Sequence, residues 1–122
     1  YRSIRFETVT LPIPQALPTT TVNFTHNGPK TRVTEWKNIP CHGSNKYSTT
    51  LTFEEPCDYE DNNFERYYPV KDRDGKNREL YEKYKNEQPE NMTFIGRCGL
   101  YAYLDMHQAI NSALATVRKF LA

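Results

Sequence analysis

An apolar stripe near the end of the chain constrains the fold more than any other feature of the sequence. Its residues recur at spacings of three and four, which places them on one face of an α-helix, and Asp105 stands before them as a candidate N-cap. Such a face must be buried, and we expect its partner to lie elsewhere in a longer polypeptide of which these 122 residues are a segment. The stripe consists of Met106, Ala109, Ile110, Ala113, Leu114, Val117 and Leu121.

The first 55 residues alternate apolar and polar side chains with a period of two, which is typical of strands. The alternating pairs include Ile4/Phe6, Val22/Phe24 and Leu51/Phe53, with Val33 beside Trp36, and they are separated by segments rich in Pro, Gly and Asn. This pattern predicts an antiparallel meander with Trp36 in its core. The acidic stretch from Pro56 to Asn63 predicts a solvated connector.

The second half of the chain predicts helices around one short strand. Lys76–Glu87 is rich in strong helix formers, and Met92–Ile95 predicts a strand that ends in the glycine turn Gly96–Gly99. We therefore expect an α+β fold with a surface helix and a C-terminal amphipathic helix. Residues 1–75 would form the antiparallel sheet, and residues 76–122 would hold the helix, strand, glycine turn and C-terminal helix.

The amino-acid composition limits the classes of partner that this chain is expected to bind. The chain has 16 Lys+Arg against 15 Asp+Glu, for a net charge of +1, so no overall field attracts nucleic acid or an anionic membrane. Hydrophobic residues make up 37% of the sequence, which is enough for one small core. No apolar run approaches the length of a membrane span, and we expect a cytoplasmic protein with neither nucleic acid nor membrane as a partner.

Three cysteines, Cys41, Cys57 and Cys98, fit neither a disulfide framework nor a paired zinc motif. Reduced thiols and no bound metal are therefore the expectation. An alternative is a zinc-binding module, in which Cys41 and Cys57 would join His26 and His42 as ligands. Finding no stoichiometric metal in the purified chain would exclude it.

Three segments together resemble a known family. They are Thr31–Lys37 (TRVTEWK), Glu65–Val70 (ERYYPV) and Asn91–His107 (NMTFIGRCGLYAYLDMH). In order and spacing they resemble the C-terminal third of the UDP-galactopyranose mutases, and the resemblance spans almost the whole chain. It implies that this α+β segment is part of a larger FAD-binding α/β flavoenzyme fold.

The resemblance also implies an activity. Members of this family are isomerases of galactofuranose biosynthesis for cell-surface polysaccharide, and they interconvert UDP-galactopyranose and UDP-galactofuranose without net redox change. Reduced FAD reacts through N5 to form a flavin N5-sugar adduct while UDP leaves; the sugar then recloses with the other ring size and UDP returns. The protein's work is positioning and charge stabilisation, which suits Arg and Tyr side chains.

Site residues follow from the same resemblance. Arg32 matches the arginine at the substrate diphosphate, where a guanidinium suits phosphate oxygens, and Tyr68 and Tyr103 match two tyrosines that bind the substrate phosphates. The residues matching the flavin site are Gly96, Arg97, Asp105 and Met106. Arg32 and Arg97 are the expected catalytic residues, and no metal is implied.

Some positions depart from the commoner family pattern. Cys98 stands where leucine is usual, Ala102 where a basic residue often stands, and His107 where an acid is frequent. A Gly-x-Gly-x-x-Gly dinucleotide motif does not occur among the five glycines. We therefore expect the N-terminal dinucleotide-binding part of the family to be absent from this segment. We also expect the segment alone to be inactive and able to self-associate through its apolar stripe. The alternative is a stand-alone, non-catalytic β domain that binds nucleotide sugars or protein.

Overall fold

The computed structural model describes residues 1–43 and 45–121, which fall into two compact units. One unit is Ser3–Glu65 and contains the sheet. The other joins Tyr1 and Arg2 to the residues from Arg66 onward and contains the helices. The sheet and the helices are therefore described in turn.

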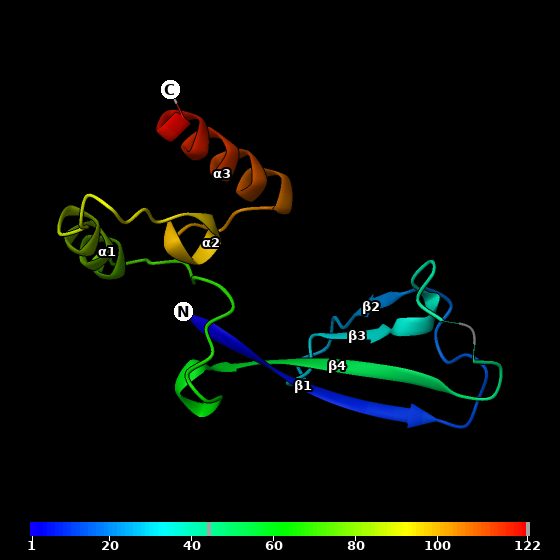
Figure 1. The fold of residues 1–122 in the computed structure, drawn as a ribbon. Helices are drawn as coiled ribbons and strands as arrows, with labels where there is room; N and C mark the ends of the chain where they lie inside the picture. The colour runs from blue at the N-terminus through cyan, green and yellow to red at the C-terminus, as the bar shows by residue number, and fades with distance from the viewer. Residues whose placement is uncertain (44, 122) are drawn as a thin grey trace. The chain divides into compact units, whose positions relative to one another are not determined.

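The sheet has four strands, β1 (Arg2–Leu11), β2 (Thr21–Asn23), β3 (Arg32–Glu35) and β4 (Thr49–Asp58), in the order β1-β4-β3-β2 (Figure 1). The prediction of a simple meander was therefore wrong for its first strand. Strands β2, β3 and β4 do follow one another in antiparallel pairs, but β1 lies on the far side of β4. Segment 12–20 carries the chain from one edge of the sheet to the other.

Strand length and threonine pairing explain why β1 lies beside β4. Both strands have ten residues, whereas β2 has three and offers little backbone to pair with. Hydroxyl pairs join the two long strands, Thr8 with Thr52 at 3.0 Å and Thr10 with Thr50 at 3.3 Å. Cross-strand threonine pairs of this kind stabilise a sheet locally.

Strand β4 also extends into the acidic stretch that the sequence predicted as a connector. It continues through Pro56 and the buried Cys57 to Asp58 before the 3₁₀ turn Tyr59–Asp61. Pro56 is tolerated on the β3 side because the pairing of β4 with β3 ends at Arg32 and Glu54, before Pro56 is reached. The missing N–H of Pro56 therefore removes no hydrogen bond from the described β3–β4 ladder. The prediction of a solvated connector was wrong for residues 56–58.

The core of the sheet unit is small and unusually polar. Among the described residues its buried apolar side chains are Val33, Leu51 and Cys57. Trp36 does not join them, because the strand ends at Glu35 and the next residues form the 3₁₀ turn Trp36–Asn38, which leaves the indole 38% exposed. The prediction of a core tryptophan was therefore wrong.

Glu35 is fully buried at the end of β3 and organises the polar part of this core. Its carboxylate accepts hydrogen bonds from the backbone N–H groups of Ala16 and Leu17, at 3.1 and 2.6 Å. The Thr49 hydroxyl and the Asn38 amide donate to the same carboxylate. One ionised side chain thereby fixes the β1–β2 connection against β3 and β4.

The helical unit contains α1 (Lys76–Asn86), α2 (Gly96–Gly99) and α3 (Met106–Leu121). The predicted surface helix and C-terminal helix are confirmed. Met92–Ile95 is not a strand, and Gly96–Gly99 forms a single helical turn. A strand needs a partner, and the pairing described in this unit is the isolated bridge between Arg2 and Tyr68.

The apolar stripe of α3 is exposed along its length within the described chain. Met106 is 83% exposed, and the stripe continues through Ile110, Leu114, Val117 and Leu121. No helix of the described residues is long and apolar enough to cross a membrane.

We predict that Glu35→Gln lowers the free energy of unfolding by about 1.5–3 kcal/mol, because a neutral amide replaces the acceptor of charge-assisted hydrogen bonds and presents N–H groups to other donors. Urea unfolding of the variant measures the loss. Glu7→Gln is the matched control, because Glu7 forms an exposed ion pair with Lys30 and such pairs contribute little. Equal losses in the two variants would contradict the role of Glu35.

The same carboxylate gives the sheet a pH dependence. Burial alone would raise the pKa of Glu35, but hydrogen bonds from Thr49, Leu17, Ala16 and Asn38 outweigh it and hold the pKa below its ordinary value of 4.5. A lowered folded-state pKa means that the ionised form stabilises the fold above pH 4.5 and that this stabilisation is lost as the pH falls through the folded-state value. Glu35→Gln should lack this part of the acid dependence.

Candidate functional site

An aromatic cavity in the helical unit brings together two of the tyrosines that the sequence singled out. Tyr68 and Tyr103 line it with Tyr101, and its volume is about 520 Å³. Pro69, Val70 and Lys71 complete the wall. Flat aromatic faces with hydroxyl groups at their edges suit a ligand that has both rings and oxygens.

Backbone contacts hold Tyr68 in this wall. The N–H of Arg2 donates to the Tyr68 carbonyl at 2.9 Å, and the N–H of Tyr67 donates back to the Arg2 carbonyl at 3.0 Å. The Cys98 thiol lies 3.8 Å from the carbonyl oxygens of Arg66 and Tyr67. Cys98 thus links α2 to the segment that carries Tyr68.

Arg97 connects the glycine turn to the cavity. Its Nε and Nη2 atoms donate to the Leu104 carbonyl at 2.9 and 2.5 Å, and its guanidinium lies over the ring of Tyr103, 4.7 Å from the centroid. These two hydrogen bonds of the guanidinium close the loop between residues 97 and 104, and they hold its positive charge against the ring of Tyr103. Anionic ligands are favoured beside such a charge.

Gly96 begins α2 in a left-handed conformation, with φ of +75°. A Cβ built on this residue would meet no atom within 4 Å, so the glycine is needed for its backbone angle and not for lack of space. The backbone at Gly96 is therefore open on the side where a side chain would stand. Open backbone beside Arg97 fits the close approach of a flat cofactor ring.

Asp105 and Met106 form the start of α3. The Asp105 carbonyl accepts the first helical hydrogen bond, from Ala109 at 2.9 Å, and the Gln108 side chain accepts from the Asp105 N–H at 2.8 Å. This is one half of a capping box. The Asp105 and Met106 side chains are both exposed.

Arg32 belongs to the other unit, at the start of β3. It pairs across the sheet with Asn23 on one side and Glu54 on the other. Its Nε donates to Asn23 at 3.1 Å, and its Nη1 lies 3.8 Å from a Glu54 carboxylate oxygen. The guanidinium is half-exposed and is oriented by these two neighbours.

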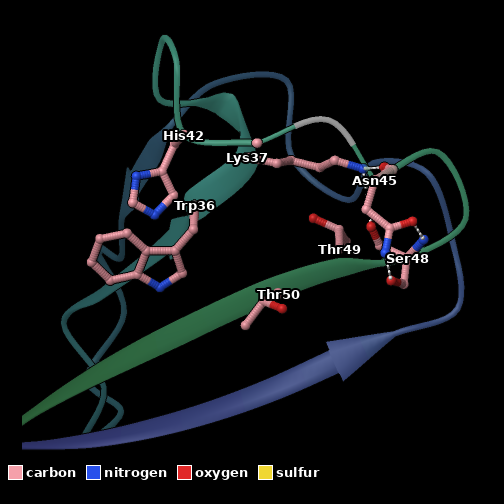
Figure 2. Close-up of a pocket in the computed structure, with 8 residues that line it drawn as sticks. Trp36, Lys37, His42, Asn45, Ser48, Thr49 and Thr50 are labelled. Carbon is pink, nitrogen blue, oxygen red and sulfur yellow. Dashed lines mark hydrogen bonds between the residues drawn. The ribbon is translucent and has the colours of Figure 1, made fainter.

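A second cavity, of about 420 Å³, lies in the sheet unit where the 3₁₀ turn meets the β3–β4 loop. Figure 2 shows the Trp36 indole beside the His42 ring, with the centroids 5.5 Å apart. The Lys37 ammonium donates to the carbonyls of Pro14, Asn45 and Ser48. Those bonds hold two loops together, so Lys37 serves the fold and not a ligand.

Sequence reasoning assigned no site role to Tyr101 or Lys71, which both line the cavity. The two tyrosines around Ala102 were a usable signal, because tyrosine rings and hydroxyls suit a ligand that has both rings and oxygens. Nothing in the sequence indicated a role for Lys71, because a lysine after Pro-Val is typical of an ordinary surface residue.

Comparison with known proteins decides the family. The family model described as "UDP-galactopyranose mutase" matches residues 1–103. The chain belongs to the UDP-galactopyranose mutase family. The resemblance drawn from its three motifs is thereby confirmed.

Its relatives are bacterial mutases. The chain is similar to the UDP-galactopyranose mutase of Mycoplasma pneumoniae, with 30% identity over 99% of this chain and 31% of the relative, and to that of Mycoplasma genitalium, with 33% identity over 75% and 24%. It is also similar to a dTDP-fucopyranose mutase of Escherichia coli, with 36% identity over 76% and 24%. The chain thus spans less than a third of the length of these mutases.

Gly96→Ala should destabilise the helical unit by about 1–2 kcal/mol, because an L-residue is strained at positive φ. Gly99→Ala is the matched control. Gly99 lies in the same turn without a positive φ, and its added Cβ would meet Phe94 at an ordinary 3.5 Å. Thermal unfolding of the two variants compares them, and a Gly96→Ala protein as stable as Gly99→Ala would contradict a backbone role for Gly96.

Proposed function

We propose that this chain forms part of the catalytic site of a flavin-dependent isomerase that interconverts UDP-galactopyranose and UDP-galactofuranose in the cytoplasm, supplying galactofuranose for cell-surface polysaccharide. The family supports a mutase acting on a nucleotide sugar. The observation that carries the proposal is the cavity in which Tyr68 and Tyr103 share one wall and Arg97 lies against Tyr103.

In this proposal the cavity holds the substrate diphosphate. The Tyr68 and Tyr103 hydroxyls donate to phosphate oxygens, and Arg97 and Lys71 supply positive charge beside them. Arg32, in the sheet unit, is proposed separately, on the family resemblance, as an arginine that binds the substrate diphosphate. Departure of UDP from the sugar develops negative charge on these oxygens, and fixed donors stabilise that charge without reorganising.

Gly96, Arg97 and the start of α3 at Asp105 and Met106 would hold the flavin. The open backbone at Gly96 admits a flat ring, and Arg97 lies next to it with its charge fixed by Leu104. The reduced flavin, when bound, supplies the nucleophile for the anomeric carbon. The chain's own residues orient the sugar and hold the leaving diphosphate.

A second candidate substrate follows from the relative that is named a dTDP-fucopyranose mutase. Assaying the full-length protein with UDP-galactopyranose and dTDP-fucopyranose in parallel distinguishes the two. The stand-alone binding domain stays the alternative to an enzyme, and it predicts binding of nucleotide sugar with no turnover of either.

In the full-length protein, Arg32→Ala should lower turnover about 10- to 150-fold while bound FAD stays in place, because a charge-assisted contact to the diphosphate of about 1.5–3 kcal/mol is lost. Tyr68→Phe and Tyr103→Phe should cost less, because each removes one hydroxyl. Steady-state kinetics and flavin absorbance measure the two effects.

Arg5→Ala is the control for Arg32. Arg5 is an exposed arginine of the same sheet, paired with Glu55 at 3.3 Å, and its removal should leave turnover unchanged. Unchanged kinetics in Arg32→Ala would contradict the proposal that Arg32 binds the substrate diphosphate. Loss of flavin from a tyrosine variant would place that tyrosine on the cofactor instead.

The isolated 122-residue chain should be colourless and should take up no FAD. Gly96, Arg97 and the start of α3 offer helix-terminus contacts of roughly 0.3–1 kcal/mol each, which cannot offset an association cost of at least about 4 kcal/mol. The exposed stripe of α3 should make the isolated chain self-associate. Fluorescence titration with FAD and light scattering test the two statements, and a stoichiometric yellow complex at micromolar FAD would favour the stand-alone domain.

A further inference from the structure

Tyr101 has a buried hydroxyl for which the described residues provide no hydrogen-bond partner. The residue lines the aromatic cavity together with Tyr68 and Tyr103. Buried hydroxyls are nearly always paired, and an unpaired one costs free energy. An unpaired donor in a cavity wall is therefore a feature that the free protein alone does not explain.

The backbone at Tyr101 is also unusual. Its φ is +45°, in the left-handed region that bulky residues rarely adopt. Such strain persists where surrounding contacts impose it, and it clusters at functional sites. Here the N–H of Tyr101 donates to the Cys98 carbonyl at 3.2 Å, and the N–H of Ala102 to the Arg97 carbonyl at 3.1 Å, so the turn after α2 imposes the angle.

Two other tyrosines hold the Tyr101 ring in place. Tyr1 meets it edge-on at 5.2 Å, and Tyr81 of α1 stacks on it at 6.2 Å. The Tyr1 hydroxyl donates to the Cys98 carbonyl at 2.9 Å. The Tyr1 hydroxyl therefore has a hydrogen-bond partner in the described chain, whereas the Tyr101 hydroxyl has none.

We infer that Tyr101 is a third substrate-contacting tyrosine, whose hydroxyl donates a hydrogen bond to a phosphate oxygen of the nucleoside diphosphate. The inference rests on the proposed function, because it places the diphosphate in this cavity. Phosphate is the matching chemistry, since Lys71 lines the same wall and Arg97 lies over Tyr103.

Two properties of the site fit this role. Burial, and after it the charge of Asp72, raises the pKa of Tyr101, so the hydroxyl stays protonated at neutral pH and remains a donor. The hydroxyl is covered in the unliganded chain, so binding must displace part of the wall to reach it. Tyr103, 71% exposed, is the most exposed of the three wall tyrosines.

The test is Tyr101→Phe in the full-length protein, with UDP as the probe and two readouts. Thermal unfolding without ligand should give an unchanged or higher Tm, because no hydrogen bond of the free protein is lost. The dissociation constant for UDP, measured by calorimetry, should rise roughly 2- to 12-fold with the loss of one hydrogen bond.

Two tyrosine variants serve as controls. Tyr1→Phe should lower the Tm and leave the UDP affinity unchanged, because its hydroxyl bonds to Cys98. Tyr84→Phe, on the exposed side of α1, should change neither quantity.

The outcomes separate the inference from the proposed function. If the unsubstituted protein fails to bind UDP, the proposed function fails. If it binds UDP and Tyr101→Phe binds equally well, the inference alone is overturned. A lower Tm in Tyr101→Phe also overturns it, whatever the affinity, because the hydroxyl would then have a partner in the free protein.

Discussion

The ionised carboxylate of Glu35 is the contact on which the sheet depends. It accepts hydrogen bonds from the β1–β2 connection, from the start of β4 and from Asn38. Three segments of the chain therefore converge on one buried group. Two residues on, the Lys37 ammonium binds carbonyls of two loops. A small apolar core is adequate in this unit because Glu35 and Lys37 also hold its segments together. The Glu35 carboxylate does so through backbone N–H groups, and the Lys37 ammonium does so through backbone carbonyls.

The sequence was sufficient to predict the elements with strong periodicity. Helix α1 and the C-terminal helix α3 were predicted because their residues have high helix propensity or a continuous apolar stripe. The order of the strands was not predictable in the same way, since alternation identifies a strand but not its neighbour. Which strand lies beside β4 is decided by matched length and by Thr8 meeting Thr52, and both depend on the register of the complete sheet.

Errors in the prediction occurred where a tertiary contact overrides local pattern. Pro56 and its acidic neighbours indicated a loop, yet β4 continues through Pro56, because its pairing with β3 has already ended at Glu54. Trp36 indicated a core residue, yet β3 ends one residue earlier at the buried Glu35. Tyr68 and Tyr103 were predicted as site residues, but only coordinates could show that they line one cavity with Tyr101, because Tyr68 lies 33 residues before Tyr101 and 35 residues before Tyr103 in the chain.

The position of Trp36 has an optical consequence. It is the single tryptophan of the chain, and it lies in the sheet unit, half-exposed and stacked on His42. Indole emission from this chain therefore reports on the β3–β4 loop, with the neighbouring imidazole as its quencher. The tyrosine cavity belongs to the other unit, which has no tryptophan, so a change confined to that cavity leaves the indole emission unaltered.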